Sequence, residues 1–261
     1  MCRKPCKPLI PAVGPKKQMT FIPPKEDLAS QIGVLYKYVK IDNARLLVRA
    51  KSMIKDKSLW FWHVTGQNDK NECKPFVFFG GDGRARYNYF KKDFKEAFPN
   101  HPSKYLEKQA RKAARKPTVP AANKVYDYWA ICCFTTKGNS PDLWKEYAGK
   151  GAGIVIEYEA KEGLSIGLAS KITYSNKKIK LDILKITEEV CYNIITTKTK
   201  RWEHEEEYRM TMRLGDPKIG QNFFFNDVKI LSVRLGENLG LEYSKTIQKL
   251  CTKNHIPVYQ Q

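Results

Sequence analysis

Residues 198–212 read Lys-Thr-Lys-Arg-Trp-Glu-His-Glu-Glu-Glu-Tyr-Arg-Met-Thr-Met, and the predicted fold is organised around this stretch. From Glu207 onward, apolar and polar side chains alternate, which is the two-residue period of a half-buried strand. Glutamates therefore gather where a strand begins. Because the backbone at the start of a strand holds a side chain rigidly, Glu205 and Glu207 are candidates for fixed carboxylates at the rim of a cleft.

Strands and helices are predicted on both sides of this stretch, without the strict strand–helix alternation of a doubly wound parallel sheet. The first helix can be capped by Asp42 or Asn43. The predicted class is α+β, with residues 27–261 in a single domain whose mixed, mostly antiparallel central sheet is flanked by helices. Strands are expected at 33–39, 59–64, 126–134, 154–158, 171–174, 223–225, 230–235 and 256–259, and helices at 43–54, 84–117, 141–149, 179–197 and 241–252.

The chain is strongly basic, because 47 Lys and Arg residues against 27 Asp and Glu residues give a net charge of +20 in 261 residues. This charge exceeds what solubility requires, so nucleic acid is the first expected partner and an acidic protein or anionic membrane surface the second. No apolar run approaches the roughly 20 residues that span a bilayer, and we expect a soluble protein of a reducing cytoplasm. The seven cysteines include no C-x-x-C pair and the four histidines lack ligand spacing, so neither a metal site nor a disulfide framework is expected.

Two segments concentrate the positive charge. Residues 1–26 carry six prolines among Lys and Arg, which is typical of a flexible basic arm. A basic helical insertion is predicted at about 84–117, where cations recur every three or four residues along one helix face. We expect this face to bind nucleic-acid phosphates, although a merely solvated face has the same pattern. Its residues are Lys104, Lys108, Arg111, Lys112, Arg115 and Lys116.

Four blocks of sequence, in order, are Leu35-Tyr36-Lys37-Tyr38 with Asn43; Leu59-Trp60-Phe61 with Asn68-Asp69; Cys133-Phe134-Thr135 with Leu143-Trp144, Tyr147-Ala148 and Gly153-Ile154-Val155-Ile156-Glu157; and Trp202 with Glu205, Glu207, Tyr208 and Arg209. In this order they resemble the bacterial and phage proteins grouped as domain of unknown function 2971. With a closing strand at 231–236, the resemblance runs from about residue 34 to 259. The chain departs from the family at Glu146 and Gly151, where histidines are frequent, and at 67–70, where Gln-Asn-Asp-Lys replaces Phe-Asn-Asp-Pro.

The order of strands also resembles, more loosely, the ADP-ribosyltransferases, including toxins of this class that act on DNA. The first strand carries Tyr36-Lys37-Tyr38, the middle strand ends in Phe134-Thr135 and the late strand opens with Glu207. In those enzymes a polar residue of the first strand holds a ribose or phosphate, the middle strand shapes the nicotinamide pocket, and the glutamate stabilises positive charge on the ribose. The resemblance implies an ADP-ribosyltransferase-like sheet and NAD as a substrate.

This resemblance implies roles for individual residues. Cleavage of the nicotinamide–ribose bond passes through an oxocarbenium-like state, which a fixed carboxylate stabilises, so Glu207 is the first catalytic candidate and Glu205 the second. Lys37 or Arg209 is expected to hold the pyrophosphate. The other candidate cofactor-binding residues are Tyr36, Tyr38, Thr135, Trp144 and Tyr147.

Structural roles for the same residues stay open at this point. Glu205 and Glu207 can form an ion-pair network with neighbouring arginines and lysines at the start of the strand. Trp144 and Trp202 can be core or cleft-wall aromatics instead of ligand stackers.

Three functions follow from these patterns. The first hypothesis is an NAD-dependent ADP-ribosyltransferase that acts on nucleic acid or a nucleic-acid-bound protein in conflict between phage and bacterium. The second is a non-catalytic nucleic-acid-binding protein that grips phosphates with its arm and basic helix. The third is a metal-dependent nuclease that would need Asp69, Glu157 and Glu205, which lie on different blocks.

Overall fold

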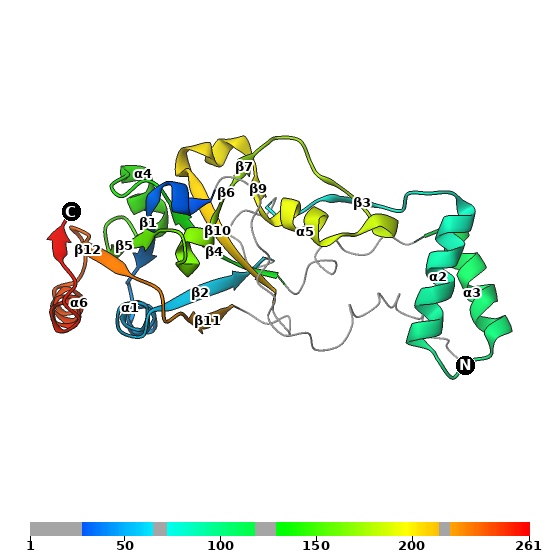
Figure 1. Cartoon of the computed structure of the whole chain (residues 1–261), viewed down its shortest axis with the longest axis horizontal. Helices are drawn as coiled ribbons and strands as arrows, with labels where there is room; N and C mark the ends of the chain where they lie inside the picture. Colours follow the sequence, from blue (N-terminus) through cyan, green and yellow to red (C-terminus); the bar gives the residue numbers. More distant parts are fainter. Residues whose placement is uncertain (1–27, 65–71, 118–128, 214–219) are drawn as a thin grey trace.

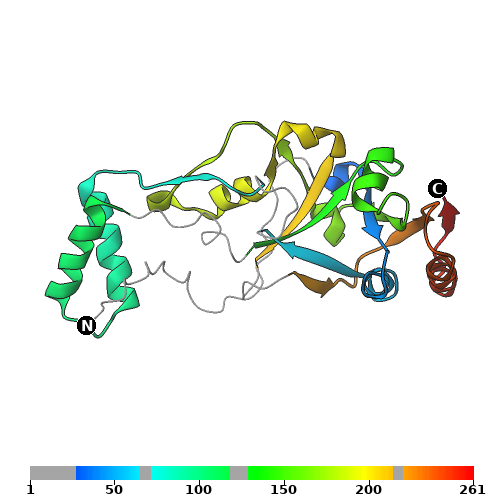
Figure 2. The ribbon, with the colours of Figure 1, turned by 180° about the vertical axis from the view of Figure 1, so that it is seen from behind.

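The central sheet collects strands from the whole length of the chain (Figures 1 and 2). The computed structural model describes residues 28–64, 72–117, 129–213 and 220–261, so the predicted arm at 1–26 lies outside the described residues. Neighbouring strands of the sheet are antiparallel except for the parallel last pair, which confirms a mixed, mostly antiparallel sheet in one mixed α/β domain. The strand order is β11 (Gln221–Phe224), β2 (Ser58–His63), β4 (Trp129–Thr135), β1 (Gly33–Lys40), β5 (Gly153–Ala160), β12 (Ile230–Leu235) and β13 (Val258–Gln260), and β10 (Glu207–Arg213) joins β4 to β6 (Ser170–Lys171).

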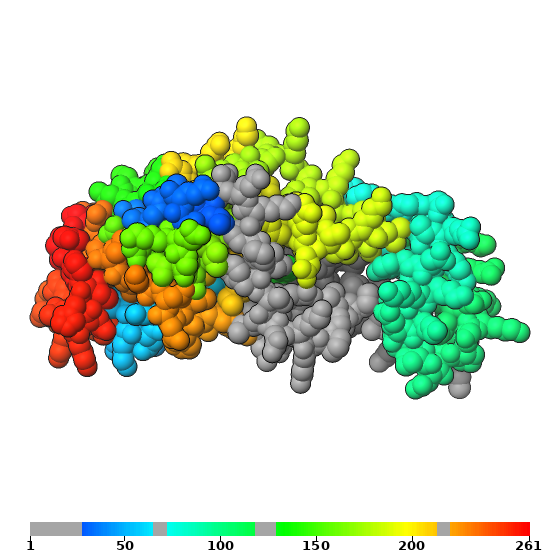
Figure 3. Space-filling model, viewed as in Figure 1, coloured from blue at the N-terminus to red at the C-terminus, as the bar shows by residue number. Residues whose placement is uncertain are grey.

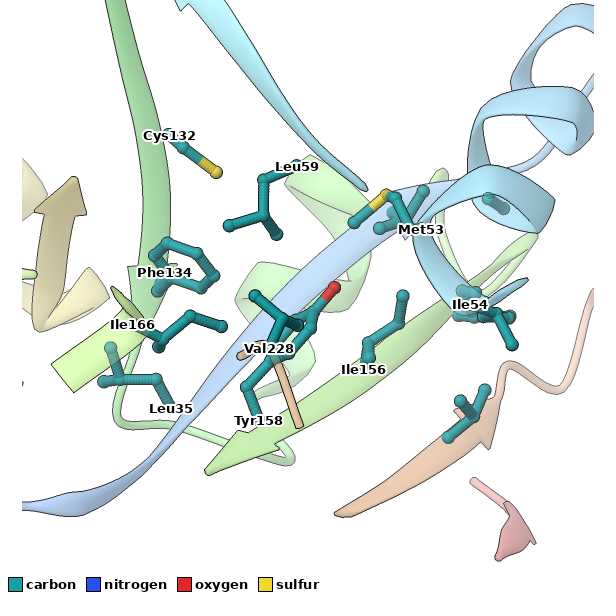
Figure 4. Packing of buried hydrophobic residues seen from close by; sticks show 14 of the residues in the cluster. Leu35, Met53, Ile54, Leu59, Cys132, Phe134, Ile156, Tyr158, Ile166 and Val228 are labelled. Carbon is teal, nitrogen blue, oxygen red and sulfur yellow. The ribbon is translucent and has the colours of Figure 1, made fainter. Parts of the chain in front are cut away.

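The main core lies between this sheet and two helices, α1 (Ala44–Lys55) and α6 (Leu241–Lys253). Asn43 caps α1, because its side-chain oxygen accepts a 3.0 Å hydrogen bond from the backbone N–H of Leu46. Figure 4 shows side chains of β1, α1, β2, β4 and β5 packed together in this core; the labelled ones include Leu35, Met53, Leu59, Phe134 and Ile156. Their burial fixes which face of β1 and β4 points away from the core.

The strand β10 is buried on both faces, so the prediction of a half-buried strand is wrong. Tyr208, Met210 and Met212 face the main core, as the alternation predicts. On the opposite face, Arg209 and Thr211 are 1% and 3% exposed. A second hydrophobic cluster explains this burial, because α5 (Glu188–Ile195) packs with Ile131 of the neighbouring β4 on that side.

The helix expected at 179–197 is also shorter than predicted. Its first part forms β8 (Lys180–Asp182) and a 3-10 turn, η5 (Ile183–Lys185), and α5 begins only after Thr187. The Thr187 hydroxyl accepts a hydrogen bond from the N–H of Val190 and caps α5 there. β8 pairs with β3 (Phe76–Phe78), and β7 (Thr173–Tyr174) pairs with β9 (Thr197–Lys198), each as a parallel pair outside the main sheet.

The basic insertion forms a helical hairpin at the end of the molecule opposite to α6 (Figures 1 to 3). Its helices are α2 (Gly83–Ala97) and α3 (Ser103–Arg115), and Asp82 caps α2 by accepting a hydrogen bond from Ala85. Two further short elements, α4 (Pro141–Tyr147) and η6 (Lys200–Glu205), lie near the start of β10. None of the described helices is long and apolar enough to cross a membrane.

The sheet divides beside β4, and this division positions the candidate site. One edge of β4 is shared by two strands: Thr135 pairs with Tyr36 of β1, whereas the start of β4 pairs with Trp62 and His63 of β2. Between these two points of pairing, β1 and β2 move apart from each other along the edge of β4. The helix α1 connects β1 to β2. The opposite edge of β4 pairs with β10 along its whole length. This divergence leaves a wedge between β1 and β2, and β4 forms the floor of the wedge.

Candidate functional site

A cavity of about 390 Å³ occupies this wedge, which is within the usual range for a small-molecule site. Its walls come from elements far apart in sequence. Lining residues are Tyr36, Lys37, Tyr38, Val39 and Lys40 of β1; Leu46, Arg49 and Met53 of α1; Trp60 and Trp62 of β2; Cys133, Phe134 and Thr135 of β4; Leu143, Glu146 and Tyr147 of α4; and Glu72, Lys198, Trp202, Glu205, Glu207 and Arg209.

A buried ionic cluster forms part of the cavity wall. Lys198 Nζ lies 2.5 Å from Glu205 Oε2 and 2.9 Å from Glu207 Oε2. Arg209 donates from Nε to Glu207 Oε1 at 2.6 Å, from Nη1 to the Ile195 carbonyl at 2.6 Å, and from Nη2 to both Glu207 and Glu72. Glu205, Glu207, Lys198 and Arg209 are each at most 6% exposed, so these contacts form away from bulk water.

The two glutamates have opposite pKa shifts. Burial alone would raise the pKa of Glu207, but the charges of Arg209 and Lys198 outweigh burial and hold it well below its usual range. Burial raises the pKa of Glu205, the charge of Glu207 adds to this, and Lys198 only partly opposes it. Of the two glutamates, Glu207 is therefore held in its ionised form and Glu205 takes up a proton more readily.

The cluster carries excess negative charge. It combines the carboxylates of Glu72, Glu205 and Glu207 with the cations of Lys198 and Arg209, which leaves one negative charge uncompensated when all five groups are ionised. In a low-dielectric setting such an excess favours a cation or a developing positive charge in the adjoining cavity.

Two hydrogen bonds, in addition to the ion pair with Lys198, hold Glu205 in its orientation. The Thr135 hydroxyl donates a 2.5 Å hydrogen bond to the Glu205 carbonyl, and the Tyr147 hydroxyl donates one of 2.5 Å to Glu205 Oε1. Burial, followed by the charge of Glu205, raises the pKa of Tyr147, so this phenol stays protonated and keeps donating. Between the two glutamates, Glu206 has φ 45° and ψ 51°, a left-handed conformation that ends η6 and starts β10.

Another part of the cavity wall is aromatic and basic. Trp60 and Trp62 lie on the same side of β2, and their ring centroids are 5.7 Å apart in an edge-to-face arrangement. The Arg49 guanidinium lies 4.0 Å from the centroid of the Trp60 ring and 5.3 Å from that of Trp62. Lys37 donates a 2.7 Å hydrogen bond to the Cys133 carbonyl within the wedge.

Most of the predicted site residues meet at this cavity. Trp144 is the exception: it is 2% exposed and packs with Tyr38 and Val155 in a separate small core cluster. Arg209 lines the cavity, but four of its hydrogen bonds already go to protein acceptors. The residues brought together are Tyr36, Lys37, Tyr38, Thr135, Tyr147, Glu205, Glu207 and Arg209.

The predicted phosphate-binding residues lie on α3, far from the cavity (Figure 1). All of them are exposed, while Leu106, Ala110 and Ala114 on the opposite side of α3 are buried in the hairpin. The exposed set is Lys104, Lys108, Arg111, Lys112, Arg115 and Lys116.

The structure also shows where the residues of the two alternative hypotheses lie, the ion-pair network and the nuclease. Glu205 and Glu207 do form an ion-pair network, with Lys198 and Arg209 as partners. For the nuclease hypothesis, Asp69 lies outside the described residues. Glu157 lies on β5 and accepts hydrogen bonds from Ser232 and Tyr36, with β1 and β4 between it and β10.

One group of side chains has the composition of a metal site. Donor atoms of Glu146, His204 and Glu205 lie within 4.8 Å of one another. However, Tyr147 and Lys198 already occupy both oxygens of Glu205, and the ammonium group of Lys198 would repel a cation. Within this group only Glu146 keeps a carboxylate that is not shared with a lysine, and a hard cation takes more oxygen ligands than that.

Sequence reasoning missed Lys198, Glu72 and the Arg49–Trp60–Trp62 cluster as site residues. The signal for Lys198 was present, because it opens the stretch that contains the glutamates. Trp60 and Trp62 alternate on an apolar strand, a pattern that a core strand shares. Nothing in the sequence links Glu72 to Arg209.

No protein-family model, no curated protein and no solved structure matches this chain. The functional assignment therefore depends on the geometry and charge of the cavity.

Proposed function

We propose that the protein is an ADP-ribosyltransferase that binds NAD in the wedge between β1 and β2 and transfers ADP-ribose to an acceptor on nucleic acid. The observation that carries this proposal is the presence of both signs of charge in the lining of the cavity. The lining combines the negative cluster of Glu205 and Glu207 with the Arg49 guanidinium, which lies against two indole rings.

NAD has the matching distribution of charge. Its nicotinamide ring is cationic and its pyrophosphate is anionic. In the proposed complex the nicotinamide ribose lies near Glu205 and Glu207, with Tyr147 and Trp202 as neighbouring aromatic walls. Arg49 and Lys37 would bind the pyrophosphate, since Arg209 is already bound by protein acceptors.

The two carboxylates have different roles in the proposed reaction. The bond between the nicotinamide nitrogen and ribose C1′ breaks, and its electron pair leaves with neutral nicotinamide. Ionised Glu207 stabilises the positive charge that develops on the ribose. A nucleophile on the acceptor, or water, forms the new bond to C1′, and its proton passes to Glu205, whose raised pKa suits a base.

We also propose that the chain belongs with the domain of unknown function 2971 proteins and acts in conflict between phage and bacterium. The support is the order of its sequence blocks, all four of which contribute walls of the cavity. The substitutions at Glu146 and Gly151 remain departures, so the proposed chemistry uses no histidine there.

Nicotinamide release from labelled NAD tests this proposal, with and without single-stranded nucleic acid. The wild-type protein is expected to release nicotinamide, and Glu205→Gln to reduce the rate by about a hundredfold or more with the fold retained. Glu203→Gln is the matched control, because Glu203 is exposed on the same 3-10 turn. Failure of the wild-type protein to bind or cleave NAD in all of these conditions would overturn the proposal.

A non-catalytic nucleic-acid-binding protein is the second candidate, and the exposed cations of α3 favour it. In that case Glu205→Gln leaves the biological effect intact, whereas reversal of charge at Lys108, Arg111 and Arg115 abolishes it.

A further inference from the structure

A second hollow, of about 430 Å³, adjoins the cavity along α1. Arg49 and Trp60 line both spaces, so the two share a boundary. We call the second space the α1 groove and define it by Arg45, Lys51 and Lys55 of α1 and Asn222 of β11, together with the shared pair.

The α1 groove is strongly cationic. Arg45, Arg49 and Lys51 form no ion pair with any residue in the described part of the chain, and Lys55 only approaches the exposed Asp56 at 3.9 Å. Burial, and then the charge of Arg45, lower the pKa of Arg49. Asp56 is the one carboxylate among the groove's lining residues, so the cations outnumber it, and their mutual repulsion is relieved when an anion binds between them.

The boundary with the cavity is an aromatic platform. Trp62 is 41% exposed, and the Arg49 guanidinium lies against both indole rings. The buried indole N–H of Trp60 has no hydrogen-bond partner among the described residues. Flat rings beside unpaired cations are the combination that binds successive bases and phosphates of a single strand.

We propose that the α1 groove binds a single strand of nucleic acid and directs one of its bases past Trp60 towards the cavity. Its phosphates lie at Arg45, Lys51 and Lys55, and the neighbouring base stacks on Trp62. The role of the strand as acceptor rests on the proposed ADP-ribosyl transfer. Binding of the strand in the α1 groove does not rest on it.

The strand must be unpaired because the reacting base has to reach ribose C1′ inside the cavity, and a base stacked within a duplex cannot. A nitrogen or oxygen of the base then bonds to C1′ as the nicotinamide bond breaks, and the base loses a proton to Glu205. The α2–α3 hairpin lies at the other end of the molecule (Figures 1 and 2), so its cations can add contacts with a long strand but cannot present this base.

The test compares two variants with the same net charge. The groove variant carries Arg45→Glu, Lys51→Glu and Lys55→Glu, and the hairpin variant carries Lys104→Glu, Lys108→Glu and Arg115→Glu. Fluorescence anisotropy measures their affinities for labelled single-stranded DNA, single-stranded RNA and duplex DNA at two salt concentrations. None of the six residues lines the NAD cavity.

The groove variant is expected to lose about tenfold or more in affinity for short single strands, relative to the hairpin variant. Trp62→Ala is expected to weaken the binding of single strands more than the binding of duplex DNA. Comparison of single-stranded DNA with single-stranded RNA identifies the preferred strand. Transfer of ADP-ribose to the strand should fall in the groove variant, while hydrolysis of NAD by water stays at the wild-type rate.

Wild-type affinity of the groove variant for single strands, or a preference of the wild-type protein for duplex DNA, would overturn the inference. The outcomes also separate it from the proposed function. If single strands bind in the groove but NAD is not cleaved, the proposed transferase activity is wrong and the binding site stands. If NAD is cleaved but strand binding does not depend on the groove, the transferase activity stands and the binding site is wrong.

Discussion

The hydroxyl of Thr135 donates a hydrogen bond to the backbone carbonyl of Glu205, and it joins the end of β4 to the turn that presents the buried carboxylates. The same oxygen accepts a 3.0 Å hydrogen bond from the N–H of Lys137. Thr135 also forms the pair with Tyr36 that links β4 to β1. One side chain therefore connects the division of the sheet with the orientation of Glu205.

Thr135→Val keeps the volume of the side chain but removes both hydrogen bonds. We expect a loss of about 1–3 kcal/mol in the free energy of unfolding, because the Glu205 carbonyl and the Lys137 N–H lose their partner. Urea denaturation measures this loss. Thr136→Val is the control, since Thr136 contacts the exposed Glu206 side chain, and equal losses in the two variants would contradict a special role for Thr135.

Lys198→Met removes the cation shared by Glu205 and Glu207. Breaking a buried pair in this way costs about 3–5 kcal/mol, because the carboxylates are left without their partner. The pKa of Glu205, already raised, rises further, so the stability of this variant should fall as the pH rises above the usual range of a carboxyl pKa. Lys200→Met, at an exposed position of η6, should have little effect in the same denaturation series.

Tyr147→Phe removes the phenol that hydrogen bonds to Glu205 Oε1. This hydrogen bond lowers the pKa of Glu205, so its loss raises that pKa. If Glu205 accepts the proton of the nucleophile, the low-pH limb of the rate profile for nicotinamide release moves to higher pH, and the maximal rate falls by about tenfold. Tyr243→Phe, on α6, should reproduce the wild-type profile. An unshifted limb in the Tyr147 variant would argue against Glu205 as the base.

Asp93 gives the hairpin its own pH dependence. Asp93 is buried on α2 with an unpartnered oxygen, and burial, then the charge of Glu96, raise its pKa from 3.8 to about 6. A raised carboxyl pKa means that the folded hairpin holds a proton which the unfolded chain has released. Stability should therefore fall as the pH rises from about 4 to about 6.

Asp93→Asn should remove this dependence and raise the free energy of unfolding above about pH 6 by about 1–2 kcal/mol. Thermal unfolding followed by the helical circular dichroism signal, repeated across this pH range, measures both effects. A wild-type stability that is flat between these pH values would refute the expected titration of Asp93.

The sequence predicts elements well where one local signal is sufficient. Asn43 followed by helical spacing predicts α1 and its cap, and alternation predicts which side chains of β10 face the main core. Sequence-based prediction fails where contacts between segments far apart in the chain determine the burial of a residue. The second face of β10 is buried because α5 and Glu72 cover it, and periodicity along one strand carries no information about such a covering layer.

The site was partly predictable for the same reason. Glu205 and Glu207 stood out because of their position before a strand, and Tyr147 because of the family resemblance. Lys198 was not singled out, since its role depends on the pairing of β9 with β7 beside the start of β10. Trp144 was misplaced as a stacker, because an aromatic on a short helix looks the same in sequence whether it faces a cavity or a core.

The division of the sheet also makes the α2–α3 hairpin a self-contained insertion. His63 lies opposite Ala130 in the ladder between β2 and β4, so the chain leaves the sheet and re-enters it at one point. The hairpin is part of a single excursion from that point. A protein engineer could shorten the excursion between Phe79 and Lys116, or exchange the hairpin for another helical unit, without changing the connectivity of any strand in the main sheet. The hairpin and the cavity are thus separable along the chain, and each can diversify without redesign of the other.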